Sequence, residues 1–209
     1  MLTETLARMP LVAILRGVRP DEVVAVTATL IEAGFGIIEV PLNSPEPIES
    51  IRKIADAFGE QVIIGGGTVL STDDVEAIHG AGGKLIFSPN CNLDVVRKTK
   101  ALSMISMPGC CTPSEAFAAL EAGADAIKFF PADLVTPAVV KSMCAVLPAC
   151  PLLAVGGINN SNLAAYLEAG ITGFGIGSSL YKSGKSLADL RQSADEIISA
   201  FEQARSTSN

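Results

Sequence analysis

A lysine stands in the middle of the apolar stretch AIKFFPAD (126–133). An apolar run of this kind is typical of a buried strand, and burial disfavours the charged form of an amine. We therefore expect Lys128 to have a lowered pKa and to act as an amine nucleophile that forms a Schiff base with a carbonyl substrate. Its expected surroundings are Ile127, Phe129 and Phe130. The plainer alternative is a lysine that reaches the rim of a sheet or pairs with a carboxylate.

Three further polar residues interrupt apolar runs, namely Arg16, Glu39 and Thr68. Side chains alternate along a strand, so Glu39 and Lys128 can point from different strands into one cavity. A carboxylate placed there suits general acid/base catalysis. The alternatives are a salt bridge of Glu39 to Arg16 or Lys128, an ion pair of Arg16 at the opposite ends of the strands, and a helix-capping role for the Thr68 hydroxyl.

Two glycine-rich segments, AVGGI (154–158) and GIGSS (175–179), each end an apolar run. Glycine lets backbone N–H groups approach phosphate oxygens closely, and a serine hydroxyl can add a hydrogen bond. We expect a phosphate site made by Gly156, Gly157, Gly177 and Ser178. The third segment, IIGGGTV from Ile63, lacks the lysine and spacing of a nucleotide-binding loop, so close packing or close substrate approach near Thr68 is the better interpretation.

Short apolar runs alternate with helix-period stretches along the whole chain. The predicted strands lie at LVAILRG, IIEVP, VIIGGGTV, KLIFSP, SMISMPG, AIKFFP, LLAVGGI and GFGIG. Helix starts are signalled by Thr72 before two aspartates and by Thr112 with Glu115 three residues later, and a last amphipathic helix is expected from Tyr181 onward. Serial βα units predict an α/β protein with a single (β/α)8 TIM barrel over residues 1–209. The alternative is an open doubly wound sheet, although no G-x-G-x-x-G follows the first strand.

Composition excludes several classes of protein. The net charge of −7, without a local cluster of Lys and Arg, makes nucleic acid an unsuitable partner. No uncharged apolar run is long enough for a membrane helix, so no membrane partner is expected. Five cysteines without a C-x-x-C pair argue against disulfides and zinc and indicate a reducing cytoplasm. The single His79 lies in a helical stretch, so we expect no metal site, and a lysine and a carboxylate must do the chemistry.

The motifs LVAILRG, EVPLNSP, GGGTVL, SPN, PGC, KFFPA, VGGI and GIGSSLY follow one another along nearly the whole chain. Together they resemble the bacterial 2-keto-3-deoxy-6-phosphogluconate and 2-keto-3-deoxy-6-phosphogalactonate aldolases, which are class I aldolases on a small (β/α)8 barrel. The resemblance implies that Lys128 forms the Schiff base, that Glu39 is the general acid/base, and that no metal or organic cofactor is needed. It also implies a homotrimer. The further contacts that it implies are Arg16 and Thr68 with the keto-acid end, Pro89 and Phe130 as pocket walls, and Gly156, Gly157, Gly177 and Ser178 with the phosphate.

Within this family the resemblance favours the galactonate substrate. The gluconate enzymes commonly show TLRT after the glutamate and a threonine before the paired glycines, whereas this chain has PLNS with Asn43, and Val155. The two substrates differ in configuration at C4. A valine at position 155 has a methyl group where threonine has a hydroxyl, and this difference beside the phosphate loop can change which epimer is held. Without the TLRT arginine, carboxylate recognition falls to Arg16. The implied reaction cleaves 2-dehydro-3-deoxy-6-phosphogalactonate to pyruvate and D-glyceraldehyde 3-phosphate.

Two alternatives remain open. The gluconate epimer could be the substrate, or the barrel could bind a sugar phosphate without catalysis or as an isomerase. Lys128 is the feature that separates these classes, because an isomerase needs a base and an electrophile but no amine nucleophile.

Overall fold

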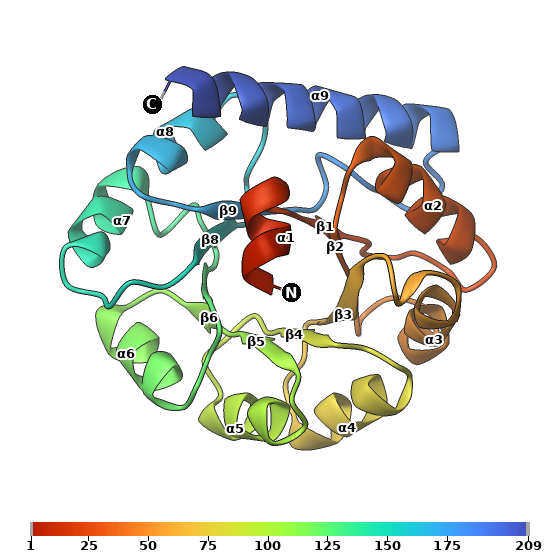
Figure 1. The fold of residues 1–209 in the computed structure, drawn as a ribbon, viewed down its shortest axis with the longest axis horizontal. Coiled ribbons are helices and arrows are strands. Elements are labelled where there is room, and N and C mark those ends of the chain that lie inside the picture. Colours follow the sequence, from red (N-terminus) through yellow and green to blue (C-terminus); the bar gives the residue numbers. More distant parts are fainter. Residues whose placement is uncertain (1, 208–209) are drawn as a thin grey trace.

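The chain folds into a ring of parallel strands surrounded by helices (Figure 1). The computed structural model describes residues 2–207, so Met1, Ser208 and Asn209 of the predicted domain lie outside the described residues. The strands are β1 (Leu11–Ile14), β2 (Ile37–Pro41), β3 (Ile63–Gly67), β4 (Leu85–Phe87), β5 (Ile105–Met107), β6 (Gly109–Cys110), β7 (Ile127–Phe129), β8 (Leu152–Val155) and β9 (Gly173–Ile176). The helices are α1 (Leu2–Arg8), α2 (Val23–Ala33), α3 (Pro47–Phe58), α4 (Thr72–Gly80), α5 (Leu93–Ala101), α6 (Pro113–Glu121), α7 (Pro137–Cys144), α8 (Leu163–Glu168) and α9 (Leu187–Thr207).

The short strands β5 and β6 together occupy one strand position of the ring. They are separated by Pro108, which has no N–H to donate. On one side the N–H of Ser88 donates to the C=O of Met107 at 3.2 Å, and β5 pairs with β4. On the other side the N–H of Lys128 donates to the C=O of Pro108 at 3.0 Å, and β6 pairs with β7. The ring is therefore closed, which confirms the predicted (β/α)8 barrel and shows that the open-sheet alternative is wrong.

Alternate residues of each strand fill two apolar layers. In β1, Val12 and Ile14 lie inside the barrel, whereas Leu11 and Ala13 pack against the helices outside. The same alternation in β7 points Lys128 inward and places its neighbours Ile127 and Phe129 in the outer layer. The expectation that these two residues surround the lysine is therefore wrong. A side chain shares its environment with residues two positions away, not one.

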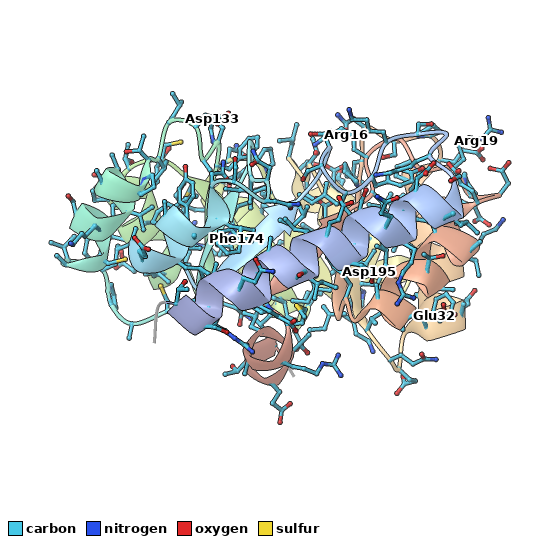
Figure 2. The ribbon with its side chains drawn as sticks, turned by 90° about the horizontal axis from the view of Figure 1, so that it is seen from above. Arg16, Arg19, Glu32, Asp133, Phe174 and Asp195 are labelled. Carbon is cyan, nitrogen blue, oxygen red and sulfur yellow. The ribbon has the colours of Figure 1, made fainter. Side chains whose placement is uncertain are left out.

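Helix α1 covers the end of the barrel at which the strands begin. Its side chains Leu2 and Leu6 pack against the apolar cluster inside the barrel. In Figure 1 this helix lies across the centre of the ring, and in Figure 2 it lies at the edge opposite Arg16 and Asp133. The sequence did not predict this helix.

The helix boundaries follow local chemistry. The capping box of Thr112 and Glu115 is present at the start of α6, as predicted, but the cap of α4 is Ser71, one residue before the predicted Thr72. The last helix begins at Leu187 rather than near Tyr181. Residues 181–186 instead form a loop, in which Gly184 has a φ of 80° and Ser186 accepts a hydrogen bond from the N–H of Asp189 at 3.1 Å. Helix α9 then packs beside α2 and α8 (Figure 1).

Candidate active site

A cavity of about 390 Å³ opens where the strands end, on the side of the barrel opposite α1. All the residues that the sequence singled out lie on its walls: Arg16, Glu39, Thr68, Pro89, Lys128, Phe130, Val155, Gly156, Gly157, Gly177 and Ser178. The barrel brings them together because the carboxyl ends of parallel strands meet at one face. The cavity also includes residues that were not predicted, among them Tyr181, Lys182 and Ser183.

Lys128 lies deep in this cavity and is only 5% exposed. Its Nζ is 4.1 Å from the centre of the Phe87 ring and 4.7 Å from that of Phe130. Within residues 2–207 no ion pair or hydrogen bond engages this amine, so the structural alternatives of a lysine at the rim or in a salt bridge are wrong. Burial lowers the pKa of Lys128 to about 8, against the opposing effect of the Glu39 charge. About a tenth of the amine is then neutral near pH 7, far more than for an ordinary lysine, and this neutral form can act as a nucleophile.

Glu39 lies in the same cavity and is 2% exposed. Burial raises the pKa of Glu39 to about 7, although the charges of Lys128 and Arg16 act in the opposite direction. Its Oε2 atom is buried and accepts no hydrogen bond from the described residues, and no ion pair involves this carboxylate. The predicted alternative of a salt bridge is therefore wrong. A carboxyl group that titrates near neutrality and keeps a free oxygen is suited to carry protons.

Gly67 gives the Glu39 carboxylate its space. A Cβ on Gly67 would lie 1.9 Å from Oε2 of Glu39, which is far inside van der Waals contact. The adjacent Gly66 faces the helices, where a Cβ would meet Ile78. The predicted close packing in the GGGTV segment is thus present, but the sequence could not show that one glycine of the three adjoins the acid/base candidate.

Thr68 and Arg16 follow the ends of β3 and β1. Thr68 has a φ of 56°, an uncommon conformation for a β-branched residue, and α4 is capped by Ser71, so the capping alternative for Thr68 is wrong. Arg16 is exposed at the mouth, which excludes the ion pair predicted as an alternative at the far end of the barrel (Figure 2). Its guanidinium donates a hydrogen bond to the side-chain oxygen of Asn43, and the N–H of Gly17 donates to Ser44 Oγ at 2.9 Å.

The ends of β8 and β9 form a set of open backbone donors. Gly156 and Gly157 have φ values of 93° and 74°, which strongly favour glycine. Within residues 2–207, the N–H groups of Gly156, Gly157, Gly177 and Ser178 donate no hydrogen bond. Donors left open at the rim of a cavity suit the oxygens of a bound anion. The Asp133 carboxylate borders this group, because a Cβ on Gly157 would lie 2.3 Å from its Oδ1.

No cluster of three or more His, Cys, Asp or Glu side chains in the described part of the chain could hold a metal ion. None of the helices in that part combines the length and the apolar character needed to cross a bilayer.

A (β/α)8 barrel whose mouth holds a buried lysine of lowered pKa and a buried carboxyl group of raised pKa in one cavity has the features of a class I aldolase. The chain matches the family model "KDPG and KHG aldolase" over residues 2–194, and it belongs to that family. It is therefore an aldolase, a carbon–carbon lyase, as the sequence motifs indicated.

Individual relatives agree with this assignment. The chain is 44% identical over 198 residues to the 2-dehydro-3-deoxy-6-phosphogalactonate aldolase of Escherichia coli K12, covering 94% of this chain and 97% of that protein. It is 46% identical over 194 residues to a probable 2-dehydro-3-deoxy-6-phosphogalactonate aldolase of Rhizobium meliloti, covering 92% of each. It is also similar to a solved structure described as native KDPGal, with a TM-score of 0.93, 44% identity, and coverage of 95% of this chain and 97% of that one.

Proposed function

We propose that this chain cleaves 2-dehydro-3-deoxy-6-phosphogalactonate to pyruvate and D-glyceraldehyde 3-phosphate by Schiff-base catalysis. The observation that carries the proposal is the buried Lys128 amine, with its lowered pKa, beside the Glu39 carboxyl in one cavity. Two relatives named for this substrate, at 44% and 46% identity, support it over the gluconate epimer. A non-catalytic or isomerase barrel would have no use for a neutral amine at this position.

Neutral Lys128 attacks the C2 ketone and forms a carbinolamine. Loss of water gives an imine, and Glu39 supplies and removes the protons that this step requires. The C4 hydroxyl then loses its proton and becomes the aldehyde as the C3–C4 bond breaks, and the electron pair of that bond moves through C2 to the imine nitrogen as an enamine. Protonation at C3 gives the pyruvyl imine, and its hydrolysis takes up one water, which balances the water lost earlier, releases pyruvate and regenerates the lysine. The carboxyl of unusual pKa is suited to these transfers in both directions.

The remaining walls are assigned by position. Arg16 and Thr68 bind the keto-acid end, Pro89 and Phe130 form apolar walls, and Val155 contacts the substrate next to the phosphate. The phosphate is bound by Gly156, Gly157, Gly177 and Ser178, whose open N–H groups support this role.

We propose further that the chain is a single domain, a homotrimer and a cytoplasmic protein. One closed ring runs from β1 to β9, with α1 and α9 both packed on it, which supports one domain. Large apolar side chains are exposed on and around α6 and α7, namely Phe117, Leu134, Val139 and Val146, which supports an interface between subunits there. All five cysteines are free thiols, as suits a reducing compartment. Sedimentation equilibrium measures the trimer directly.

The proposed chemistry is tested by trapping. Incubation with pyruvate and borohydride should leave a carboxyethyl group on Lys128, because the hydride reduces the imine. Peptide mapping locates the label, and Lys100, whose amine pairs with Asp125 at 2.6 Å, serves as an internal control that should stay unlabelled. EDTA should not change turnover. Absence of the label, or a label on another lysine, would refute Schiff-base catalysis by Lys128.

A further inference from the structure

The loop between β9 and α9 brings an additional cation to the mouth of the cavity. Lys182 and Ser183 are exposed and line the cavity together with Ser178. The loop is fixed on both sides of these residues. The Tyr181 hydroxyl donates to Glu22 Oε1 at 3.0 Å, and Lys185 Nζ donates to the C=O of Leu180 at 2.8 Å. Lys182 therefore extends from an anchored segment.

The position of this loop relates Lys182 to the open backbone donors. The turn that begins at Gly177 accepts, at the Gly177 C=O, hydrogen bonds from the N–H groups of Leu180 and Tyr181. Lys182 follows that turn directly. On the other side, the Cβ of Ser183 lies 3.5 Å from where a Cβ on Gly17 would stand. Lys182 thus lies between the donors of the β9 end and the Arg16 loop.

The charge of Lys182 has no partner within residues 2–207. No ion pair or hydrogen bond there engages its amine, although the chain carries a net charge of −7 and acidic side chains are plentiful. Among the other lysines of the described residues, Lys98 pairs with Glu76 and Lys100 with Asp125, whereas the exposed Lys141, like Lys182, forms no ion pair but does not line the cavity. An unpaired cation at the rim of a cavity attracts anions.

A cation at this position favours the binding of an anion by the neighbouring N–H donors. Backbone N–H groups carry only partial charges, and the Asp133 carboxylate beside Gly157 opposes the approach of a dianion. A full positive charge that lines the same cavity offsets that repulsion. Lysine binds phosphate as a mobile point charge, which fits an exposed side chain.

We propose that Lys182 binds the phosphate group of the substrate and completes the site formed by the backbone N–H groups of Gly156, Gly157, Gly177 and Ser178. The proposal rests on the proposed function, because it assumes a phosphorylated sugar acid with its keto end at Lys128. It assigns a different cation to each charged end of that substrate, with Arg16 at the carboxylate and Lys182 at the phosphate.

The test compares Lys182→Met with Lys182→Arg and with Lys98→Met, a matched loss of a lysine that does not line the cavity. Three quantities are measured for each variant. They are kcat/KM for the phosphorylated substrate and for its non-phosphorylated counterpart, the inhibition constant of glycerol 3-phosphate, and the rate of pyruvate trapping on Lys128.

For Lys182→Met we expect about a tenfold loss of kcat/KM on the phosphorylated substrate and a similar weakening of glycerol 3-phosphate, because one charge-assisted hydrogen bond is lost. The non-phosphorylated substrate and pyruvate trapping should not change. Lys182→Arg should keep most of the activity, and Lys98→Met should match the unmodified protein. Lys182→Gln, which keeps a polar side chain, should behave as Lys182→Met does.

Two results would overturn the proposal. One is an unchanged inhibition constant for glycerol 3-phosphate in Lys182→Met. The other is an equal loss on both substrates, which would place Lys182 at the carboxylate end. Failure of the proposed function is distinguishable, because it appears as absence of pyruvate trapping in the unmodified protein, while binding of glycerol 3-phosphate still reports on Lys182.

Discussion

Replacing Gly67 by alanine should lower kcat by about 10²-fold while leaving the barrel folded. The new Cβ would lie 1.9 Å from Oε2 and 2.4 Å from Cδ of Glu39. Non-bonded heavy atoms of this kind settle at about 3.5 Å, so the carboxylate must move by more than about 1 Å. A displacement of about 1 Å in a catalytic group costs about 10²-fold in rate, which corresponds to about 2.7 kcal/mol in the activation barrier.

The same strand offers a matched control. In Gly66→Ala the added methyl group points away from the cavity and meets the end of the Ile78 side chain in the helix layer. We expect this variant to lose stability through overpacking and to keep kcat within a few-fold of normal. Pyruvate release measured by a coupled dehydrogenase assay gives kcat, and thermal melting monitors the fold.

A Gly67→Ala variant that turns over at close to the normal rate, while Gly66→Ala behaves as expected, would show that Gly67 does not position Glu39. The same conclusion would follow if the two variants lost activity and melting temperature in parallel, since that result would mean that the glycine serves only the packing of the barrel. Pyruvate trapping separates the steps further, because a displaced Glu39 should slow imine formation without preventing it.

Two further predictions concern the same cavity. Glu39→Gln should lower kcat by about 10²- to 10⁴-fold with the fold retained. The negative charge of Glu39 raises the pKa of Lys128 from the value that burial alone would set, so the variant should have a lower pKa at Lys128. The pH at which the trapping rate rises, which we expect near 8 in the unmodified protein, should therefore move to lower pH. A rise that stays in place, or moves to higher pH, would contradict the coupling. Val155→Thr should shift the ratio of kcat/KM toward the gluconate epimer by about ten- to a hundredfold, the effect of one hydrogen bond gained or left unpaired, and an unchanged ratio would remove Val155 as the determinant.

Much of this site follows from alternation along strands. A polar residue in an apolar strand points either into the barrel or toward the surrounding helices, and only the mouth of the barrel has space for a polar side chain. The meeting of Lys128 and Glu39 in one cavity could therefore be predicted. The glycine pair at 156–157 was recognisable because its backbone conformation and its place at a strand end leave few other residues possible.

The remainder depends on contacts between distant segments. Phe87, whose ring lies 4.1 Å from the Lys128 amine, is one of four phenylalanines in the predicted strands, and only the register of β4 places it there. The periodicity of the sequence placed Lys182 in the last helix. In the structure Lys182 lies in the loop of residues 181–186, because Gly184 and the cap at Ser186 delay the start of α9. Helix α1 is too short to be recognised by its own pattern and is stabilised by the interior that Leu2 and Leu6 cover.

The cover that α1 places over one end of the barrel leaves a single exit for both products of a turnover. On the proposed mechanism the three-carbon fragment stays covalently attached to Lys128, at the depth of the cavity, while the phosphorylated fragment lies near Ser178 and Lys182 at the rim. With the opposite end occupied by Leu2 and Leu6, both fragments must leave through the mouth. The aldehyde is then the first product to dissociate and pyruvate the last, because the bond to Lys128 holds the deeper fragment until it is hydrolysed and the only exit is the one that the aldehyde has vacated.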